Sequence, residues 1–212
     1  MPPGSHYFKS APLDRGTLRD LQVVIAGRPV TVATAAGVFS ASRIDLGTAV
    51  LLRTLARLGP MHGLPPAGLL VDLGCGWGPL TLTMASLAPR AQVAAIDVNQ
   101  AARELTEINA DRLGLTNVVT LDPSETAALT SVDAIWSNPP VRIGKAALVE
   151  LLTDWTARLA PDGQADFVIG RHLGADSIQA QLNQLGHPTD RLASAKGDRV
   201  LRTGHPRGAQ NP

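Results

Sequence analysis

The sequence predicts an α/β fold in which helices pack against a parallel sheet. From about residue 69 onward, short apolar runs that end in Gly, Asp or Pro alternate with segments of helix length. The length of 212 residues, 44% of them hydrophobic and 17% charged, is typical of one medium globular domain. The expected strands cover residues 69–73, 92–97, 118–122, 133–137 and 165–170.

The helices between these strands are predicted from residues that begin or end helices. Pro79 stands where a first-turn proline loses no hydrogen bond, and Pro89 should close that helix. Asn99 is the expected N-cap of the next helix, which should stop at Gly114. Two further helices are expected, one over residues 145–159 that ends at the sequence Ala-Pro-Asp-Gly with Pro161 and Gly163, and one over residues 175–185.

The two ends of the chain depart from this alternation. Strands over 189–195 and 199–203 flank a Lys-Gly-Asp turn, which predicts an antiparallel hairpin at the sheet edge. Before the sheet, a small hairpin is expected around Gly27, followed by a helix that Asp45 caps. We therefore divide the chain into an N-terminal extension packed on the core (1–65), a core (66–205) and a frayed tail (206–212).

Composition argues against several classes of protein. Nineteen Lys+Arg and 18 Asp+Glu give a net charge of +1, which indicates neither a nucleic-acid coat protein nor an acidic tail. The single cysteine, Cys75, excludes an internal disulfide framework and is expected to be a small buried filler. The five histidines lack the spacing of a metal site, so we expect no metal. The sequence shows neither an apolar stretch of about 18 residues nor a signal peptide, which predicts a cytoplasmic protein without a membrane partner.

A glycine-rich loop follows the first strand of the core and opens a helix. Gly74, Gly76 and Gly78 have the spacing G-x-G-x-G, which allows the backbone to approach a ligand closely at the helix N-terminus. This spacing differs from the G-x-G-x-x-G of a dinucleotide fold, and Asp72 before it can take the positive end of a ligand. The alternative interpretation is a tight strand-to-helix turn that binds nothing.

Two acids at the ends of the next strands extend the predicted pocket. Asp97 can accept hydrogen bonds from both ribose hydroxyls of an adenosine, although by itself it can simply end a strand. Asp122 can accept from the adenine amino group or be an ordinary loop residue. The glycine loop and Asp97 together predict a binding site for S-adenosylmethionine.

A second motif, Ser-Asn-Pro-Pro, follows the fourth strand at the sheet edge where open α/β sheets bind ligands. The side-chain oxygen of Asn138 and the carbonyl of Pro139 can both accept hydrogen bonds from one planar NH2 group. Such acceptors localise the lone pair on nitrogen and aim it at an electrophilic methyl group. By itself the motif can be a rigid turn. Beside a methyl-donor site it predicts N-methyl transfer.

Several motifs carry a resemblance to a known family, and together they cover most of the chain. They are HYF from His6, GVFSASRIDLGTAVLL from Gly37, DLGCGWGPL from Asp72, AIDVNQAA from Ala95, SNPPVRIGK from Ser137, LGADSIQ from Leu173 and AKGDRVLR from Ala195. With them the chain resembles class I S-adenosylmethionine-dependent methyltransferases, specifically the small-domain family that methylates guanine N2 in 16S ribosomal RNA. The resemblance implies a Rossmann-like seven-stranded sheet with helices on both faces and an antiparallel last strand.

The resemblance also implies a substrate and further site residues. Asn138 would hold the amine of a guanine in ribosomal RNA or in the small ribosomal subunit. The segment 39–48 would fold over the active site, with Arg43, Asp45 and Thr48 near the cofactor methionine or the target base. We assign Thr48 to the cofactor and Arg43 to the base.

The residue after Asn-Pro-Pro departs from a common pattern. Many amine methyltransferases have an aromatic residue there to stack on the target base, whereas this chain has Val141. Stacking is then expected from Phe39, Tyr7 or Phe8, with Arg142 as a guanidinium platform.

Two questions stay open at this point. Arg199 and Arg202 belong to a group of basic residues that can either form a rim for RNA or be ordinary solvated side chains. The methyl acceptor can instead be adenine N6, a protein glutamine or a small molecule, and a non-catalytic cofactor-binding chaperone of RNA assembly is a further alternative.

Overall fold

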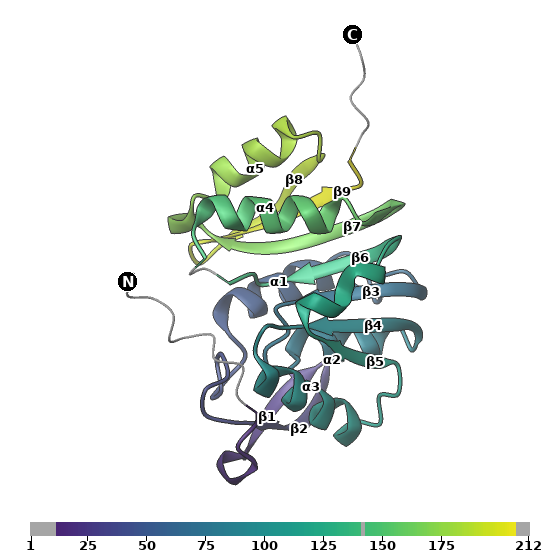
Figure 1. Cartoon of the computed structure of the whole chain (residues 1–212), viewed down its shortest axis with the longest axis vertical. Helices are drawn as coiled ribbons and strands as arrows, with labels where there is room; N and C mark the ends of the chain where they lie inside the picture. Colours follow the sequence, from purple (N-terminus) through teal and green to yellow (C-terminus); the bar gives the residue numbers. More distant parts are fainter. Residues whose placement is uncertain (1–11, 141–142, 207–212) are drawn as a thin grey trace.

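A seven-stranded mixed sheet forms the centre of the computed structural model, which describes residues 12–140 and 143–206 (Figure 1). Its strand order is β5-β4-β3-β6-β7-β9-β8, and the pairs among β5, β4, β3, β6 and β7 are all parallel. Strand β9 runs antiparallel to both of its neighbours, which confirms the expected antiparallel last strand. The strands are β3 (Ala67–Leu73), β4 (Arg90–Ile96), β5 (Val118–Leu121), β6 (Val132–Ser137), β7 (Leu159–Gly170), β8 (Thr189–Ala195) and β9 (Asp198–Gly204).

Helices cover both faces of this sheet, as predicted for the α/β class. Successive strand residues point to opposite faces, so Leu70 packs with α1 and α2 whereas Val71 packs with α4 and α5. Helix α3 packs against α2 through Leu105 and Leu82. The helices are α1 (Leu46–Ala56), α2 (Pro79–Leu87), α3 (Gln100–Arg112), α4 (Lys145–Thr156) and α5 (Ala175–Gln184). None of the helices in residues 12–140 and 143–206 is both long and apolar enough to cross a membrane.

A separate hairpin of β1 (Arg19–Ile25) and β2 (Arg28–Thr34) packs beside α3, at the end of the molecule opposite α5 in Figure 1. The buried amide of Asn109 in α3 joins the hairpin to the core. Its oxygen accepts from the N–H of Ala33 at 2.6 Å, and its nitrogen donates to the carbonyls of Ala33 and Trp77, both at 2.9 Å. The hairpin is thereby connected to the glycine-rich loop, which contains Trp77.

The two largest differences between predicted and observed boundaries both lie around Pro161. The helix expected over 145–159 ends at Thr156, and the strand expected over 165–170 already begins at Leu159. Gly163, which is expected to follow the end of a helix, lies inside β7 instead. A Cβ on Gly163 would lie 2.5 Å from the carbonyl oxygen of Val132, so only glycine allows β7 to approach β6 where their register shifts.

Candidate active site

The candidate site lies at the carboxyl ends of β3, β4 and β6, where the strand order reverses and open α/β sheets bind ligands. A cleft there opens to solvent. The residues that line it are Phe39, Ser40, Asp45, Thr48, Gly74, Cys75, Gly76, Trp77, Pro79, Leu80 and Asn138. The cleft therefore brings the glycine loop, the Asn-Pro-Pro motif and the segment before α1 together.

The glycine loop is bound to the end of β4 through its backbone. The N–H groups of Gly74 and Cys75 both donate to the carbonyl of Ile96, at 2.8 and 3.0 Å. The three glycines have φ angles of 85°, 59° and 98°, in the left-handed region that favours glycine. A Cβ on Gly78 would lie 3.1 Å from Oγ1 of Thr106, whereas a Cβ on Gly76 would have no atom within 4 Å. Gly78 thus serves packing, and Gly76 leaves space in the cleft.

Asp97 follows β4 directly and is held by two backbone donors. Its Oδ2 accepts from the N–H of Gly76 at 3.0 Å and its Oδ1 from the N–H of Asn99 at 2.9 Å. Burial raises the pKa of Asp97, while these two bonds and the charge of Arg103 act in the opposite direction. Each carboxylate oxygen keeps a lone pair with which it can accept a further hydrogen bond.

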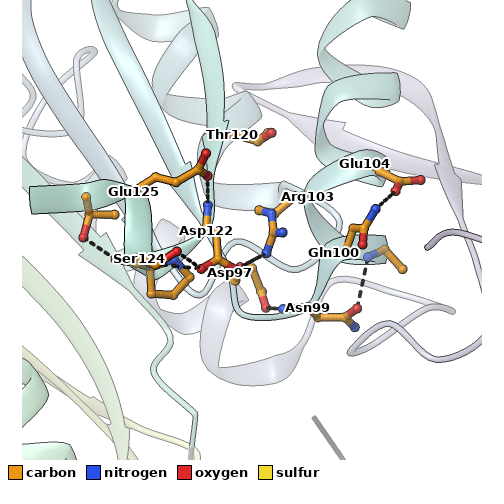
Figure 2. A network of polar contacts seen from close by, with 12 residues as sticks. Asp97, Asn99, Gln100, Arg103, Glu104, Thr120, Asp122, Ser124 and Glu125 are labelled. Carbon is orange, nitrogen blue, oxygen red and sulfur yellow. Dashed lines mark hydrogen bonds and ion pairs between the residues drawn. The ribbon is translucent and has the colours of Figure 1, made fainter. Parts of the chain in front are cut away.

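Arg103 connects the two acids that were predicted to bind adenosine (Figure 2). Its Nη1 donates to the carbonyl of Asp97 at 2.5 Å and to Oδ2 of Asp122 at 3.1 Å. Hydrogen bonds from Ser124, together with Arg103, lower the pKa of Asp122. Sequence reasoning did not find Arg103, because nothing in its local pattern marks it as the link between two strand ends.

Asp72 lies in β3, and its buried side chain faces α2. Its Oδ2 accepts from the N–H and the hydroxyl of Thr81 at 2.8 and 2.6 Å, and its Oδ1 has no hydrogen-bond partner within the described residues. Burial raises its pKa to about 7. Asp72 is not among the residues that line the cleft, and neither are Gly78, Asp97 and Asp122. The contacts of these four residues with a ligand stay predictions.

Asn138 meets the N-terminus of α1. Its Nδ2 donates to Oδ2 of Asp45 at 2.9 Å and to Oγ1 of Thr48 at 3.0 Å. Asp45 is the N-cap of α1, as predicted, and its Oδ2 also accepts from the N–H of Gly47 at 2.8 Å. No hydrogen bond to Oδ1 of Asn138 is found within residues 12–140 and 143–206. Pro139, the other predicted acceptor, is buried directly after Asn138.

The segment before α1 lies against the glycine loop. The indole Nε1 of Trp77 donates to the carbonyl of Ser40 at 3.3 Å. Phe39 lines the cleft with 65% of its side chain exposed, whereas Arg43 is exposed and does not line it. Trp77 was not predicted, although its place between two glycines of the loop is a signal that could have indicated it.

One predicted residue, Cys75, is buried, and several others lie outside the residues that the structure describes. Cys75 is buried, as expected of a filler, and burial raises the pKa of its thiol. The predicted residues Val141 and Arg142, together with His6, Tyr7 and Phe8, lie outside the described residues.

The expectation that Arg202 is free for RNA or for solvent is wrong. Its Nε and Nη2 each donate to the buried carboxylate of Asp166 at 2.8 Å. Arg199 lies 3.5 Å from Asp176. Arg202 therefore balances a charge inside the sheet, because a buried carboxylate without a partner is strongly unfavourable.

A family profile and several known proteins are similar to this chain. The profile of the methyltransferase small domain matches residues 29–202. The protein YbxB of Bacillus subtilis is 26% identical over 93% of this chain and 96% of its own length. The ribosomal RNA small subunit methyltransferase C of Shewanella oneidensis is 31% identical over 76% of this chain and 46% of the relative. The ribosomal RNA large subunit methyltransferase G of Streptomyces avermitilis is 34% identical over 71% of this chain and 39% of the relative.

One similar solved structure holds two small molecules. It is the T. thermophilus 16S rRNA N2 G1207 methyltransferase in complex with AdoMet and guanosine, which matches with a TM-score of 0.74 and 26% identity over 92% of this chain and 53% of that chain. This chain spans nearly all of the B. subtilis relative but only about half, or less, of the ribosomal RNA methyltransferases that it matches. Because the profile covers most of the sequence, the chain belongs to the methyltransferase small domain family.

Proposed function

We propose that this chain is an S-adenosylmethionine-dependent methyltransferase that methylates the exocyclic N2 amine of a guanine in small-subunit ribosomal RNA. The observation that carries the proposal is the state of the Asn138 amide. Its nitrogen is engaged by Asp45 and Thr48, while its oxygen has no partner among the described residues and belongs to a cleft beside the glycine loop. An unused acceptor at that place suits a substrate that brings an NH2 group.

The residues around the cleft fit the cofactor. Gly74 and Gly76 bring backbone without side chains to its edge, and the space next to Gly76 is open. Asp97 has lone pairs for the ribose hydroxyls. Arg103 donates hydrogen bonds to both Asp97 and Asp122 and so connects the two acids. We assign the cofactor to these residues. When bound, it supplies an electrophilic methyl group.

The residues of the chain would prepare the amine for transfer. The amine of guanine is conjugated with its ring and is a weak nucleophile. Oδ1 of Asn138 and the carbonyl of Pro139 would accept its two hydrogens and keep the lone pair on the nitrogen. A strong general base is not needed, because the nitrogen becomes acidic only as it gains the methyl group and positive charge. Phe39, two-thirds exposed at the cleft, offers a face on which an extruded base can stack.

The similar proteins support ribosomal RNA as the substrate and differ on the subunit. The S. oneidensis relative is named for the small subunit and the S. avermitilis relative for the large one. The T. thermophilus structure contains guanosine, which supports guanine as the base. We choose the small subunit because the T. thermophilus structure is that of a 16S rRNA methyltransferase, and its match covers 92% of this chain.

Nucleoside mapping by mass spectrometry tests the proposal. Ribosomal RNA from cells with and without this protein is digested, and N2-methylguanosine is assigned to positions in each subunit. We expect one such site in small-subunit RNA to lose its methyl group and to regain it with the wild-type protein but not with Asn138→Ala. Loss of N6-methyladenosine, loss of a site only in large-subunit RNA, or full rescue by Asn138→Ala would contradict the proposal.

A further inference from the structure

We infer that Asp45 is a positioning residue that, together with Thr48, orients and polarises the amide of Asn138 for methyl transfer. This inference rests on the proposed function and assigns to the N-terminus of α1 a part in it. The residues that carry it come from two distant segments, since Asp45 and Asn138 are 93 positions apart in the chain.

Orientation follows from the chemistry of the two acceptors. A carboxylate can only accept hydrogen bonds, so the group of Asn138 that lies 2.9 Å from Oδ2 of Asp45 must be its NH2. Thr48 takes the second hydrogen of the same NH2 at 3.0 Å. A flipped amide would lose the bond to Asp45 and bring its oxygen against the carboxylate, and only the hydroxyl of Thr48 could then donate to that oxygen. The nitrogen of the Asn138 amide therefore faces Asp45, and its oxygen lies on the other side of the amide group.

Polarisation follows from the charge of Asp45. A hydrogen bond to a carboxylate is stronger than one between neutral groups, and hydrogen-bonded groups polarise one another. Electron density in the Asn138 amide then shifts from nitrogen to oxygen, which makes Oδ1 a better acceptor. The amine of the substrate gains positive charge during transfer, so a better acceptor stabilises the transition state more than the bound substrate.

Asp45 is itself held rigidly. Its Oδ2 accepts from the backbone N–H groups of Gly47 and Thr48, at 2.8 and 3.4 Å, and α1 is anchored by the fully buried side chains of Leu51 and Leu55. A Cβ on Gly47 would lie 3.1 Å from Oδ2 of Asp45 and 3.5 Å from both amide atoms of Asn138. The carboxylate of Asp45 and the amide of Asn138 thus both lie close to Gly47, where a larger side chain would disturb their contact.

The variant Asp45→Asn separates this role from that of a helix cap. Asparagine caps helices as well as aspartate, so the unfolding midpoint should change little. The charge is lost, however, and an amide at position 45 can present its own NH2 to Asn138. We expect kcat for methyl transfer to ribosomal RNA to fall by about 10- to 100-fold, and the cofactor Kd to stay within about twofold. Asp14→Asn, which changes an exposed N-cap aspartate that does not line the cleft, is the matched control and should leave kcat unchanged.

A double-mutant cycle shows whether Asp45 acts through Asn138. In an Asn138→Ala background, Asp45→Asn should cause no further loss of rate, because the amide that it orients is absent. Independent losses that multiply would overturn the inference and indicate a structural role. A normal kcat in Asp45→Asn beside an inactive Asn138→Ala would overturn the inference and leave the proposed function intact. A normal rate in Asn138→Ala would overturn both.

An NMR measurement decides the question without activity. In the 15N-labelled protein, the side-chain NH2 resonances of Asn138 are identified by their loss in Asn138→Ala. We expect them to be sharp and protected from solvent exchange in the wild type, and broadened or unprotected in Asp45→Asn, while Asp14→Asn leaves them unchanged. Unchanged Asn138 resonances in Asp45→Asn would overturn the inference.

Discussion

Oδ2 of Asp97 accepts a hydrogen bond from the backbone N–H of Gly76 at 3.0 Å, and this bond ties the end of β4 to the glycine loop. The N–H groups of Gly74 and Cys75 donate to Ile96 in the same place. The carboxylate and the loop are therefore set relative to one another by the fold itself, before any ligand is considered. Preorganisation of this kind lowers the cost of ordering a site on binding.

Asp97→Ala should weaken S-adenosylmethionine binding by about 30- to 150-fold, because charge-assisted hydrogen bonds to the ribose contribute roughly 2 to 3 kcal/mol. Calorimetry measures the affinity, and circular dichroism checks that the variant is folded. Asp111→Ala, which removes an exposed carboxylate from α3, is the control. Equal affinities for Asp97→Ala and the wild type would remove Asp97 from the site.

Arg103→Ala should make cofactor binding more sensitive to acid. The ionised form of Asp97 accepts hydrogen bonds from the ribose, and burial raises its pKa while the charge of Arg103 lowers it. Without Arg103 the pKa rises further, so affinity should begin to fall at a higher pH in the variant than in the wild type. Titrations of S-adenosylmethionine from pH 8 to pH 5 measure this, and coincident pH profiles would contradict the role given to Arg103.

Gly78→Ala and Gly76→Ala should both lower stability, but Gly78→Ala should act mainly on folding and Gly76→Ala mainly on cofactor binding. At Gly78 the new Cβ would lie 3.1 and 3.2 Å from atoms of Thr106, and we expect a loss of about 1 to 3 kcal/mol of stability in urea unfolding. At Gly76 no atom lies within 4 Å, so the cost is only the left-handed backbone, about 1 to 2 kcal/mol, and the main loss should be in cofactor affinity. Equal affinity in Gly76→Ala and the wild type would show that the ligand does not approach this residue.

Asp72→Asn should change how stability depends on pH. Burial raises the pKa of Asp72 from 3.8 to about 7, so its protonated form is favoured in the folded state. The resulting stabilisation is fully present below about pH 4 and is lost as pH rises through about 7, at about 1.4 kcal/mol for each unit of pKa. Urea unfolding at pH 5 and pH 8 should therefore show a fall for the wild type that Asp72→Asn lacks. The same fall in both proteins would mean that Asp72 does not titrate in this range.

Arg202→Gln should destabilise the fold without altering the salt dependence of RNA binding. The substitution leaves the fully buried Asp166 without its partner, which costs about 3 to 5 kcal/mol when a buried pair is broken. If Arg202 instead contacted phosphate, the slope of log affinity against log salt would fall by about one unit. Filter binding of ribosomal RNA at several salt concentrations, below the unfolding temperature of the variant, distinguishes the two results.

Local signals in the sequence were sufficient for most elements and failed where a distant strand decided the outcome. The caps at Asp45 and Asn99 were predicted, because each side chain bonds to a backbone N–H only two residues away. The start of β7 was missed, because Pro161 and Gly163 read locally as a helix stop. Their place in a strand depends on the pairing of β7 with β6, where Gly163 lies close to the carbonyl of Val132.

The sequence by itself was sufficient to predict that the glycine loop, the acid after β4 and the Asn-Pro-Pro motif lie at the same edge of the sheet. Each depends on backbone conformations of a few consecutive residues, and parallel strands bring their carboxyl ends to the same edge. The tertiary structure decided which of these side chains have partners. It brought Asp45 to Asn138, buried Asp72 against Thr81, and engaged Arg202 with Asp166. Such pairings depend on how helices and strands pack, and no periodicity in the chain records which distant residue will be the neighbour.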